Sequence, residues 1–262
     1  MSVLQEILAI KSEEVAERKR KVPLNSLQER SDDIRDYHSA LAGGGMSVIA
    51  EIKRKSPSQG QISADTNHVG IAKSYEQNRA VALSVLTDEK YFGGSLKFLQ
   101  NIREAVDLPV LRKDFIISEY QIWESYHAGA DAVLLILDAL AASQFAEFYQ
   151  LADELGLHVL VETHSSKSVE KLAEVLPKIV GVNARNLHTM EIEFDRMLAM
   201  RKDLPESMLA VAESGITAPD HLKQAMDAGY DAALIGTAFM STENPGETLG
   251  NYLAEVRQEV SL

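Results

Sequence analysis

The chain has 262 residues, 45% of them hydrophobic, which is enough to bury one large core. It contains no cysteine, and this excludes disulfides, thiolate metal sites and cysteine nucleophiles. The net charge of −13 argues against nucleic acid as a partner, because neutralising a phosphate backbone requires a basic face. No apolar run approaches the ~20 residues of a membrane span, and the first residues do not resemble a signal peptide. We therefore expect a cytoplasmic protein that does not contact membranes.

Residues 1–45 differ in pattern from the rest of the chain. Apolar residues at spacings of three and four, beginning with Leu4 and Ile7, predict an amphipathic helix. The charged stretch 13–21 follows, and its basic end is interpreted as a solvated helix face rather than a nucleic-acid contact. We predict an N-terminal helical extension over 1–45 and a catalytic region over 46–262, together forming one structural domain.

From residue 46 onward, short apolar runs alternate with amphipathic segments. The runs predict strands at 47–53, 82–86, 110–113, 132–136, 159–162, 179–183, 209–213 and 233–235. Helices are predicted between them, among others at 96–106, 143–155, 168–176 and 218–228. Alternation of this kind is typical of parallel βαβ units with both sheet faces covered. Eight units predict an α/β fold, a closed (β/α)8 TIM barrel, with an open doubly wound sheet as the second choice.

An internal echo supports a repeated unit. The segment 128–135 reads Ala-Gly-Ala-Asp-Ala-Val-Leu-Leu, and 228–235 reads Ala-Gly-Tyr-Asp-Ala-Ala-Leu-Ile. Each segment places a glycine at a predicted helix end just before a strand.

Polar side chains stand at the ends of several predicted strands. Strand side chains alternate between faces, and the apolar set Val48, Ala50 and Ile52 must pack under helices. Glu51 and Lys53 therefore point into the barrel. The same alternation directs a polar side chain inward at the end of four more strands: Lys113, Glu162, Asn183 (with Arg185 continuing its row) and Glu213.

The position of these charges favours a functional site. Active sites of such barrels lie at the C-terminal ends of the strands, and the N-terminal ends here carry no comparable set. Leaving a charge buried and unpaired costs several kcal/mol, so a purpose is expected. The alternative is a self-compensating ring of salt bridges that merely closes the barrel.

The loops after the seventh and eighth strands predict a phosphate site. They carry Ser214, Gly215, Gly236 and Thr237, which offer hydroxyl donors and close approach to backbone N–H groups. Two basic runs, 53–55 and 112–113, are expected to gather positive charge for an anionic substrate. The histidines show no zinc spacing, so no metal site is predicted.

Four segments resemble the motifs of the indole-3-glycerol phosphate synthases. Residues 48–60, Val-Ile-Ala-Glu-Ile-Lys-Arg-Lys-Ser-Pro-Ser-Gln-Gly, resemble the first-strand signature of that family. Leu-Arg-Lys-Asp-Phe-Ile at 111–116, Asn-Ala-Arg-Asn-Leu at 183–187 and Ala-Glu-Ser-Gly-Ile at 212–216 are similar to its third-, sixth- and seventh-strand motifs. The similarity runs in order from about residue 3 to 255. Ala184 departs from it, since many relatives have asparagine there, but alternation turns Ala184 away from the site.

The resemblance implies a reaction. The family converts 1-(2-carboxyphenylamino)-1-deoxyribulose 5-phosphate to indole-3-glycerol phosphate, carbon dioxide and water, a step of tryptophan biosynthesis. By analogy Lys113 is the general acid for ring closure, with a pKa that we expect to be lowered by its surroundings. The acid and base for dehydration come from Lys53, Glu51 and Glu162, and which does which stays open.

The resemblance also implies how the substrate is held. Asn183, Arg185 and Glu213 would position it, with Arg185 paired to the anthranilate carboxylate. Ser56 belongs to the first-strand motif and is a further candidate for substrate binding. Phe92 and Phe115 would line a pocket for the anthranilate ring, although either could be ordinary core. No metal or organic cofactor is required, and contact with other enzymes of the tryptophan pathway is left open.

Two alternative functions are disfavoured. Another phosphate-binding barrel, such as phosphoribosylanthranilate isomerase, is disfavoured because that isomerase usually relies on a cysteine–aspartate pair. A catalytically dead barrel kept as a scaffold should have lost a catalytic position. The residues that match the family's catalytic set are all present in this chain: Glu51, Lys53, Lys113, Glu162 and Asn183.

Overall fold

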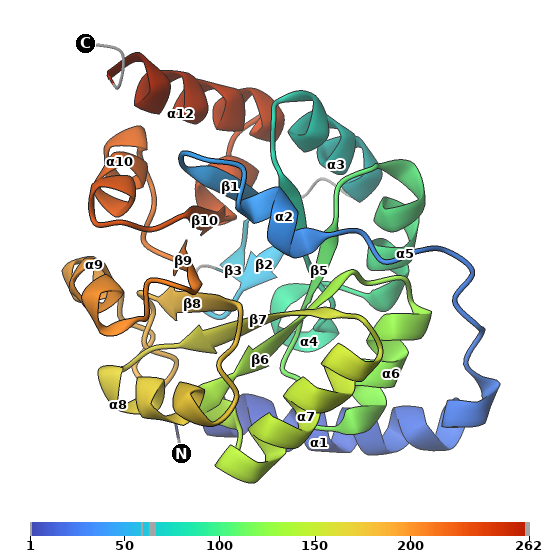
Figure 1. Cartoon of the computed structure of the whole chain (residues 1–262). Helices are drawn as coiled ribbons and strands as arrows, with labels where there is room; N and C mark the ends of the chain where they lie inside the picture. The colour runs from blue at the N-terminus through green and yellow to red at the C-terminus, as the bar shows by residue number, and fades with distance from the viewer. Residues whose placement is uncertain (1, 59, 63–66, 260–262) are drawn as a thin grey trace.

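Eight parallel strands close a barrel in a computed structural model that describes residues 2–58, 60–62 and 67–259. The strands are β1 (Ser47–Ile52), β4 (Ala82–Leu86), β5 (Val110–Lys113), β6 (Ala132–Ile136), β7 (His158–Thr163), β8 (Ile179–Asn183), β9 (Leu209–Glu213) and β10 (Ala232–Ile235). Strands consecutive along the chain are neighbours, and β10 closes on β1 (Figure 1). The closed barrel is confirmed, and each strand lies within one residue of its predicted bounds. A small hairpin, β2 (Lys55–Ser56) and β3 (Gly60–Gln61), follows β1.

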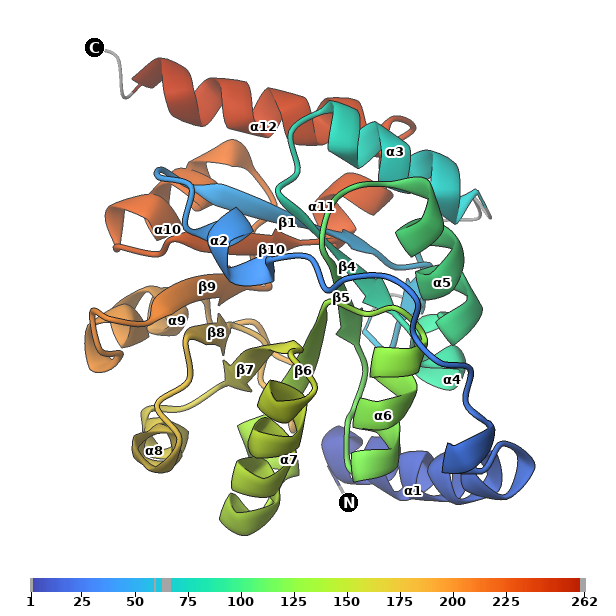
Figure 2. The same ribbon diagram turned by 45° about the vertical axis from the view of Figure 1, so that its right-hand side comes forward.

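Helices surround the barrel (Figures 1 and 2). They are α3 (His68–Gln77), α4 (Glu89–Phe92), α5 (Leu96–Ala105), α6 (Glu119–His127), α7 (Ala142–Glu154), α8 (Ser166–Val169), α9 (Phe194–Met200), α10 (Pro219–Asp227), α11 (Thr237–Met240) and α12 (Pro245–Glu259). Short 3-10 turns occur at η2 (Leu137–Ala139), η3 (Glu170–Glu174) and η4 (Arg201–Asp203). The helix predicted at 168–176 begins earlier, since the Ser165 side chain caps α8, and it continues as η3. In the described part of the chain, no helix is long and apolar enough to cross a membrane.

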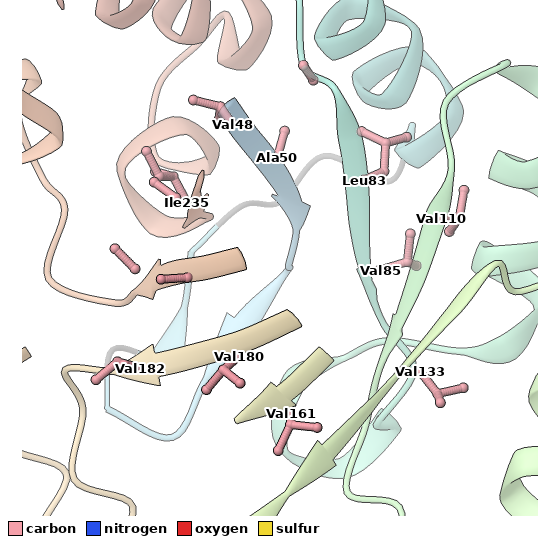
Figure 3. Close-up of a cluster of buried hydrophobic side chains, with 14 of the residues drawn as sticks. Val48, Ala50, Leu83, Val85, Val110, Val133, Val161, Val180, Val182 and Ile235 are labelled. Atoms are coloured by element: carbon pink, nitrogen blue, oxygen red, sulfur yellow. The ribbon is translucent and has the colours of Figure 1, made fainter. Parts of the chain in front are cut away.

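Alternation along the strands produces two separate cores. Outward side chains such as Val48, Ala50 and Val110 pack beneath the helices (Figure 3). Inward side chains such as Ile49 and Leu111 fill the barrel. The predicted assignment of faces is therefore confirmed, and it decides which polar residues reach the barrel mouth.

The N-terminal extension contains α1 (Val3–Lys21), η1 (Leu24–Ser26) and α2 (Tyr37–Leu41). In Figures 1 and 2, α2 lies across the end of the barrel at which the strands begin. Tyr37 and Leu41 belong to the inner core, so α2 plugs this end with apolar side chains. Helix α1 lies along the outside against α6.

The internal echo has a structural explanation. Gly129 and Gly229 adopt φ of +85° and +91°, a region that glycine enters without strain, and each ends a helix. The aspartate two residues later then accepts a strand N–H: Asp131 Oδ2 from the Val110 N–H (2.9 Å) and Asp231 Oδ2 from the Ala210 N–H (2.8 Å). Each aspartate thereby fixes the start of the preceding strand.

Candidate active site

The predicted site residues all line one cavity at the C-terminal ends of the strands. They are Glu51, Lys53, Ser56, Phe92, Lys113, Phe115, Glu162, Asn183, Arg185, Glu213, Ser214, Gly215, Gly236 and Thr237. Gln59 of the first-strand motif lies outside the described residues. Segments nearly 190 residues apart in sequence are thus brought together because parallel strands of a barrel end on the same side.

Lys113 lies at the centre of a cluster of carboxylates. Its Nζ is 2.8 Å from Glu162 Oε2 and 3.4 Å from Glu213 Oε2. The Asn183 amide donates to Glu162 Oε1 at 3.0 Å, so Glu162 receives a donor on each oxygen. These four residues lie at the C-terminal ends of β5, β7, β8 and β9, and the other three hold the Lys113 ammonium group in one place.

A second ion pair stands on β1. Lys53 Nζ lies 2.7 Å from Glu51 Oε1. Both lysine side chains keep about 15% exposure (Lys53 15%, Lys113 14%), whereas the carboxylates of Glu51, Glu162 and Glu213 are 2–6% exposed. The cations are therefore presented to the cavity, with the carboxylates behind them.

Asn183 is oriented by the chain that follows it. Its Oδ1 accepts the backbone N–H of Arg185 at 2.9 Å, which directs its amide group towards Glu162. The guanidinium of Arg185 donates to the Met190 carbonyl at 2.9 Å. Burial lowers the pKa of Arg185 against the raising effect of Glu51, but an arginine stays charged at neutral pH.

The pKa of Lys113 is raised, so the expectation of a lowered value is wrong. Burial alone would lower the pKa of Lys113, but the combined attraction of Glu162, Glu213 and Glu51 outweighs it. The lysine is consequently protonated at neutral pH. It enters the reaction in the form that can donate a proton, although as a weaker acid than expected.

Glu162 and Glu213 have pKa values that are shifted in opposite directions. Burial raises the pKa of Glu213 to about 8, with the nearby Glu162 charge adding to the effect against the opposing attraction of Lys113. Burial also opposes ionisation of Glu162, but Lys113 and the Asn183 amide lower the pKa of that group. At neutral pH Glu162 is the anion and Glu213 is the neutral acid.

This protonation pattern helps to decide whether the charges only form salt bridges that close the barrel. The salt bridges that this alternative requires, Lys53–Glu51 and Lys113–Glu162, do form. With Glu213 neutral, however, three cations line the cavity: Lys53, Lys113 and Arg185. The carboxylates of Asp88 and Asp114 also line it, but both are paired with Lys11, which does not. Three cations are thus gathered at the barrel mouth of a protein of net −13, and this favours an anionic ligand.

Two glycines make room for the carboxylates. A Cβ atom at Gly181 would lie 1.9 Å from Glu213 Oε1, and one at Gly236 would lie 2.4 Å from Glu51 Oε1. Neither contact is tolerable without displacing the carboxylate. Gly236, predicted only as a phosphate contact, therefore also admits the Glu51 side chain.

The loop after β9 has an unusual backbone. Ser214 and Gly215 adopt φ of +65° and +77° in succession. This region favours glycine, so the backbone of Ser214 is slightly strained. Both residues line the cavity together with Gly236 and Thr237 at the start of α11. The two loops predicted for phosphate thus share one wall of the cavity.

Apolar side chains form another part of the cavity. The rings of Phe92 and Phe115 lie 6.2 Å apart, tilted by 38°. Leu4 and Ile7 of α1 also line the cavity, although they were predicted only as the apolar face of a helix. The amphipathic pattern indicates that these side chains are buried, but it cannot indicate what they are buried against.

The prediction for the basic runs is only partly right. Of the two runs, Lys53 and Lys113 line the cavity, whereas Arg54, Lys55 and Arg112 do not. Arg112 alternates with Lys113 and therefore points outward, fully buried, where it pairs with Asp114 (3.1 Å) and Glu124 (2.9 Å). The charge of Arg112 is therefore neutralised by ion pairs outside the barrel interior and does not add to the charge of the cavity. Ala184, as predicted, faces away from the site into the outer core.

A closed α/β barrel with lysine–carboxylate pairs at its mouth defines a barrel enzyme that performs proton transfers on an anionic substrate. The family profile described as indole-3-glycerol phosphate synthase matches residues 4–251. The chain belongs to the indole-3-glycerol phosphate synthase family.

The similarity to individual relatives extends over nearly their whole length. The chain is 42% identical to the indole-3-glycerol phosphate synthase of Laribacter hongkongensis, with 96% of this chain and 99% of the relative covered. It is 43% identical to the enzyme of the same name from Bacteroides thetaiotaomicron, covering 97% and 99%. Among solved structures, 3-hexulose-6-phosphate synthase from Salmonella typhimurium shares the fold, with a TM-score of 0.64, 16% identity, and 80% and 100% coverage.

Proposed function

We propose that this cavity closes the indole ring of indole-3-glycerol phosphate, starting from 1-(2-carboxyphenylamino)-1-deoxyribulose 5-phosphate. The ring carbon bearing the carboxylate attacks the ketone carbon, the carboxylate leaves as carbon dioxide, and loss of a hydroxyl makes the ring aromatic. The observation that carries the proposal is Lys113, held as an ammonium between Glu162 and Glu213 at the mouth of the barrel.

Lys113 is the group we assign to the first step. As the new carbon–carbon bond forms, the ketone oxygen gains negative charge, and the Lys113 ammonium donates a proton to it. Glu162 and Asn183 hold the ammonium in position through the contacts described above. When substrate binds, its negative charge would draw the Lys113 ammonium away from Glu162 and Glu213, which hold it in this structure.

We assign dehydration to the pair on β1. Lys53 would donate a proton to the departing hydroxyl, and Glu51 would accept the proton that the ring system loses. The 2.7 Å contact between Lys53 and Glu51 allows the proton to return to the lysine after each turnover. Glu162 remains the competing candidate for the base.

The remaining residues would bind the substrate. We assign the phosphate to Ser214, Gly215, Gly236 and Thr237, which line the cavity and offer backbone N–H and hydroxyl groups. Arg185 would pair with the anthranilate carboxylate, while Phe92 and Phe115 would flank the anthranilate ring. Ser56 would contact the substrate from the loop after β1. A cytoplasmic location and contact with other enzymes of tryptophan biosynthesis stay predictions of the family relationship.

The direct experiment is to incubate purified protein with the carboxyphenylamino-deoxyribulose phosphate and follow the fluorescence of the indole product. We expect product together with one equivalent of carbon dioxide. Well-folded protein that forms neither would overturn the proposal and would favour the scaffold alternative. The dephosphorylated substrate serves as a control, and it should bind more weakly because the two phosphate-binding loops then have no ligand.

A further inference from the structure

A buried lysine outside the site holds the N-terminal extension against the barrel mouth. Lys11 of α1 is 1% exposed, and its Nζ lies 2.6 Å from Asp88 Oδ2 and 3.0 Å from Asp114 Oδ1. Glu14 of the same helix adds a third carboxylate at 3.0 Å. A lysine this deeply buried is rare and persists only when it is paired. None of the proposed catalytic steps uses it.

Both barrel aspartates that bind Lys11 line the cavity themselves. Asp114 directly follows Lys113, and it accepts the backbone N–H of Phe115 on the same oxygen that faces Lys11. Its other oxygen accepts from Thr87 at 2.6 Å. Asp88 caps α4 by accepting the Tyr91 N–H at 2.7 Å, and α4 carries Phe92. The lysine thus connects the segments that present the two phenylalanines.

On the helix side, Lys11 shares a face with the cavity-lining residues of α1. Leu4, Ile7 and Lys11 are spaced by three and four, which aligns them along one side of a helix. Leu4 and Ile7 line the cavity, and Lys11 fastens the same face one turn further along. Lys11 therefore contacts the barrel from the same face of α1 that contributes to the apolar wall.

The charges of the cluster reinforce one another. Burial opposes the charge of Lys11, but Asp114 and Asp88 raise the pKa of the lysine overall. Burial likewise opposes ionisation of Asp114, yet Arg112 and Lys11 lower the pKa of its carboxyl to about 2. Lys11 and Asp114 therefore stay ionised across the range in which the enzyme would work.

We propose that Lys11 is a positioning residue for substrate binding: its ion pairs with Asp88 and Asp114 hold α1 so that Leu4 and Ile7 complete the apolar wall that they form together with Phe92 and Phe115. We call these ion pairs of Lys11 with Asp88 and Asp114 the latch. Release of α1 opens this wall but leaves Lys113 held by Glu162 and Glu213. Loss of the latch therefore weakens binding of the substrate ring more than it slows the chemistry.

The test compares Lys11→Met with Lys21→Met on the same helix. Lys21 also pairs with a glutamate, Glu17 at 2.6 Å, but both side chains are more than half exposed. At a temperature where both variants are folded, Lys11→Met should raise KM about tenfold with kcat changed less than about threefold, since the loss is apolar contact with the ring. Lys21→Met should match the wild type, and Lys11→Arg should restore much of the lost KM.

Hydrogen–deuterium exchange supplies a readout that needs no turnover. Lys11→Met should speed exchange in α1 and in segments 87–92 and 113–116 together, whereas Lys21→Met should not. The kinetic part of this inference rests on the proposed function; wild-type protein that turns over no substrate would remove that function, while exchange would still test the latch.

Two results would overturn the latch. One is a folded Lys11→Met protein that has a lower unfolding midpoint but wild-type KM and wild-type exchange around the cavity. The other applies if Lys11→Met does not fold. Asp88→Asn then removes one of the two barrel carboxylates that bind Lys11, while Asp114 and Glu14 still neutralise the lysine. Unchanged KM and unchanged exchange in Asp88→Asn would contradict the proposal.

Discussion

At the scale of single residues, the proton on Glu213 controls how tightly Lys113 is held. Glu213 is neutral below its pKa of about 8 and becomes an anion above it. Ionisation of Glu213 places a second full negative charge 3.4 Å from the Lys113 ammonium. This charge makes it harder for the lysine to release the proton that it must donate. Values of kcat/KM report the free enzyme, so we expect kcat/KM to fall about tenfold per pH unit above pH 8.

Glu213→Gln tests this expectation, because glutamine keeps the neutral state at every pH. The variant should lack the fall centred near pH 8 while keeping measurable activity at pH 7. The measurement is a profile of kcat/KM from pH 6 to 10 for both proteins. The same descending limb in Glu213→Gln would assign the ionisation to another group.

Alternation along a strand is a local property, so the residues that point into the barrel could be predicted from sequence. The pKa of Lys113 could not be predicted in this way. Its direction depends on how many carboxylates surround the ammonium, and Glu162, Glu213 and Glu51 come from three other strands. The same holds for the partner of Arg112. Alternation predicts that Arg112 points outward, but only the fold shows that it pairs with Glu124 of α6.

At the scale of elements, β8 needs a glycine where it passes β9. Gly181→Ala would place a methyl group 1.9 Å from Glu213 Oε1 and 3.3 Å from Leu160 Cδ1. We expect the carboxylate to move away from Lys113, with a loss of about 1–3 kcal/mol in the free energy of unfolding. The raised pKa of Glu213 should also fall, because the displaced carboxyl group becomes better solvated.

Gly43→Ala is the matched control, since its Cβ would meet nothing closer than the Ala40 carbonyl at 3.9 Å. Denaturant unfolding and the pH profile of kcat/KM measure both effects. Wild-type stability and an unchanged profile in Gly181→Ala would show that the close approach of β8 and Glu213 is not required.

Helices and strands with strong patterns could be predicted closely, but their partners could not. The pattern beginning at Leu4 predicts α1, and the basic end of that helix is exposed as expected. Nothing local indicates that Leu4 and Ile7 reach a cavity built from strands roughly 40 to 230 residues away, or that Lys11 is buried against Asp88 and Asp114. Such contacts depend on the closure of the whole barrel.

At the scale of the whole molecule, Asp131 joins the extension to the barrel. It accepts the Val110 N–H, as Asp231 does for Ala210, but it also pairs with Arg30 at 3.2 Å and Arg103 at 3.1 Å. We propose on this basis that residues 1–45 and the barrel fold as one cooperative unit.

Asp131→Asn and Asp231→Asn form a matched pair that tests this unit. Both keep an oxygen for the strand N–H, but only the former removes a carboxylate shared by two buried arginine side chains, Arg30 and Arg103. Among the described residues, these arginines then keep only the half-exposed Asp32 as an ion-pair partner. We expect Asp131→Asn to lower the free energy of unfolding by about 2–3 kcal/mol and Asp231→Asn by about 1 kcal/mol. Equal effects in denaturant titrations, or a separate early transition for the extension in the wild type, would contradict the proposal.

The measurement that tests the account most directly is single-turnover conversion of the carboxyphenylamino-deoxyribulose phosphate by Lys113→Met. Methionine keeps the length and packing of the side chain while removing the proton donor. If Lys113 is the general acid, the rate of indole formation should fall about 10²–10⁴-fold, with the substrate dissociation constant changed by much less. A folded Lys113→Met protein that turns over at a near-wild-type rate would contradict the central claim.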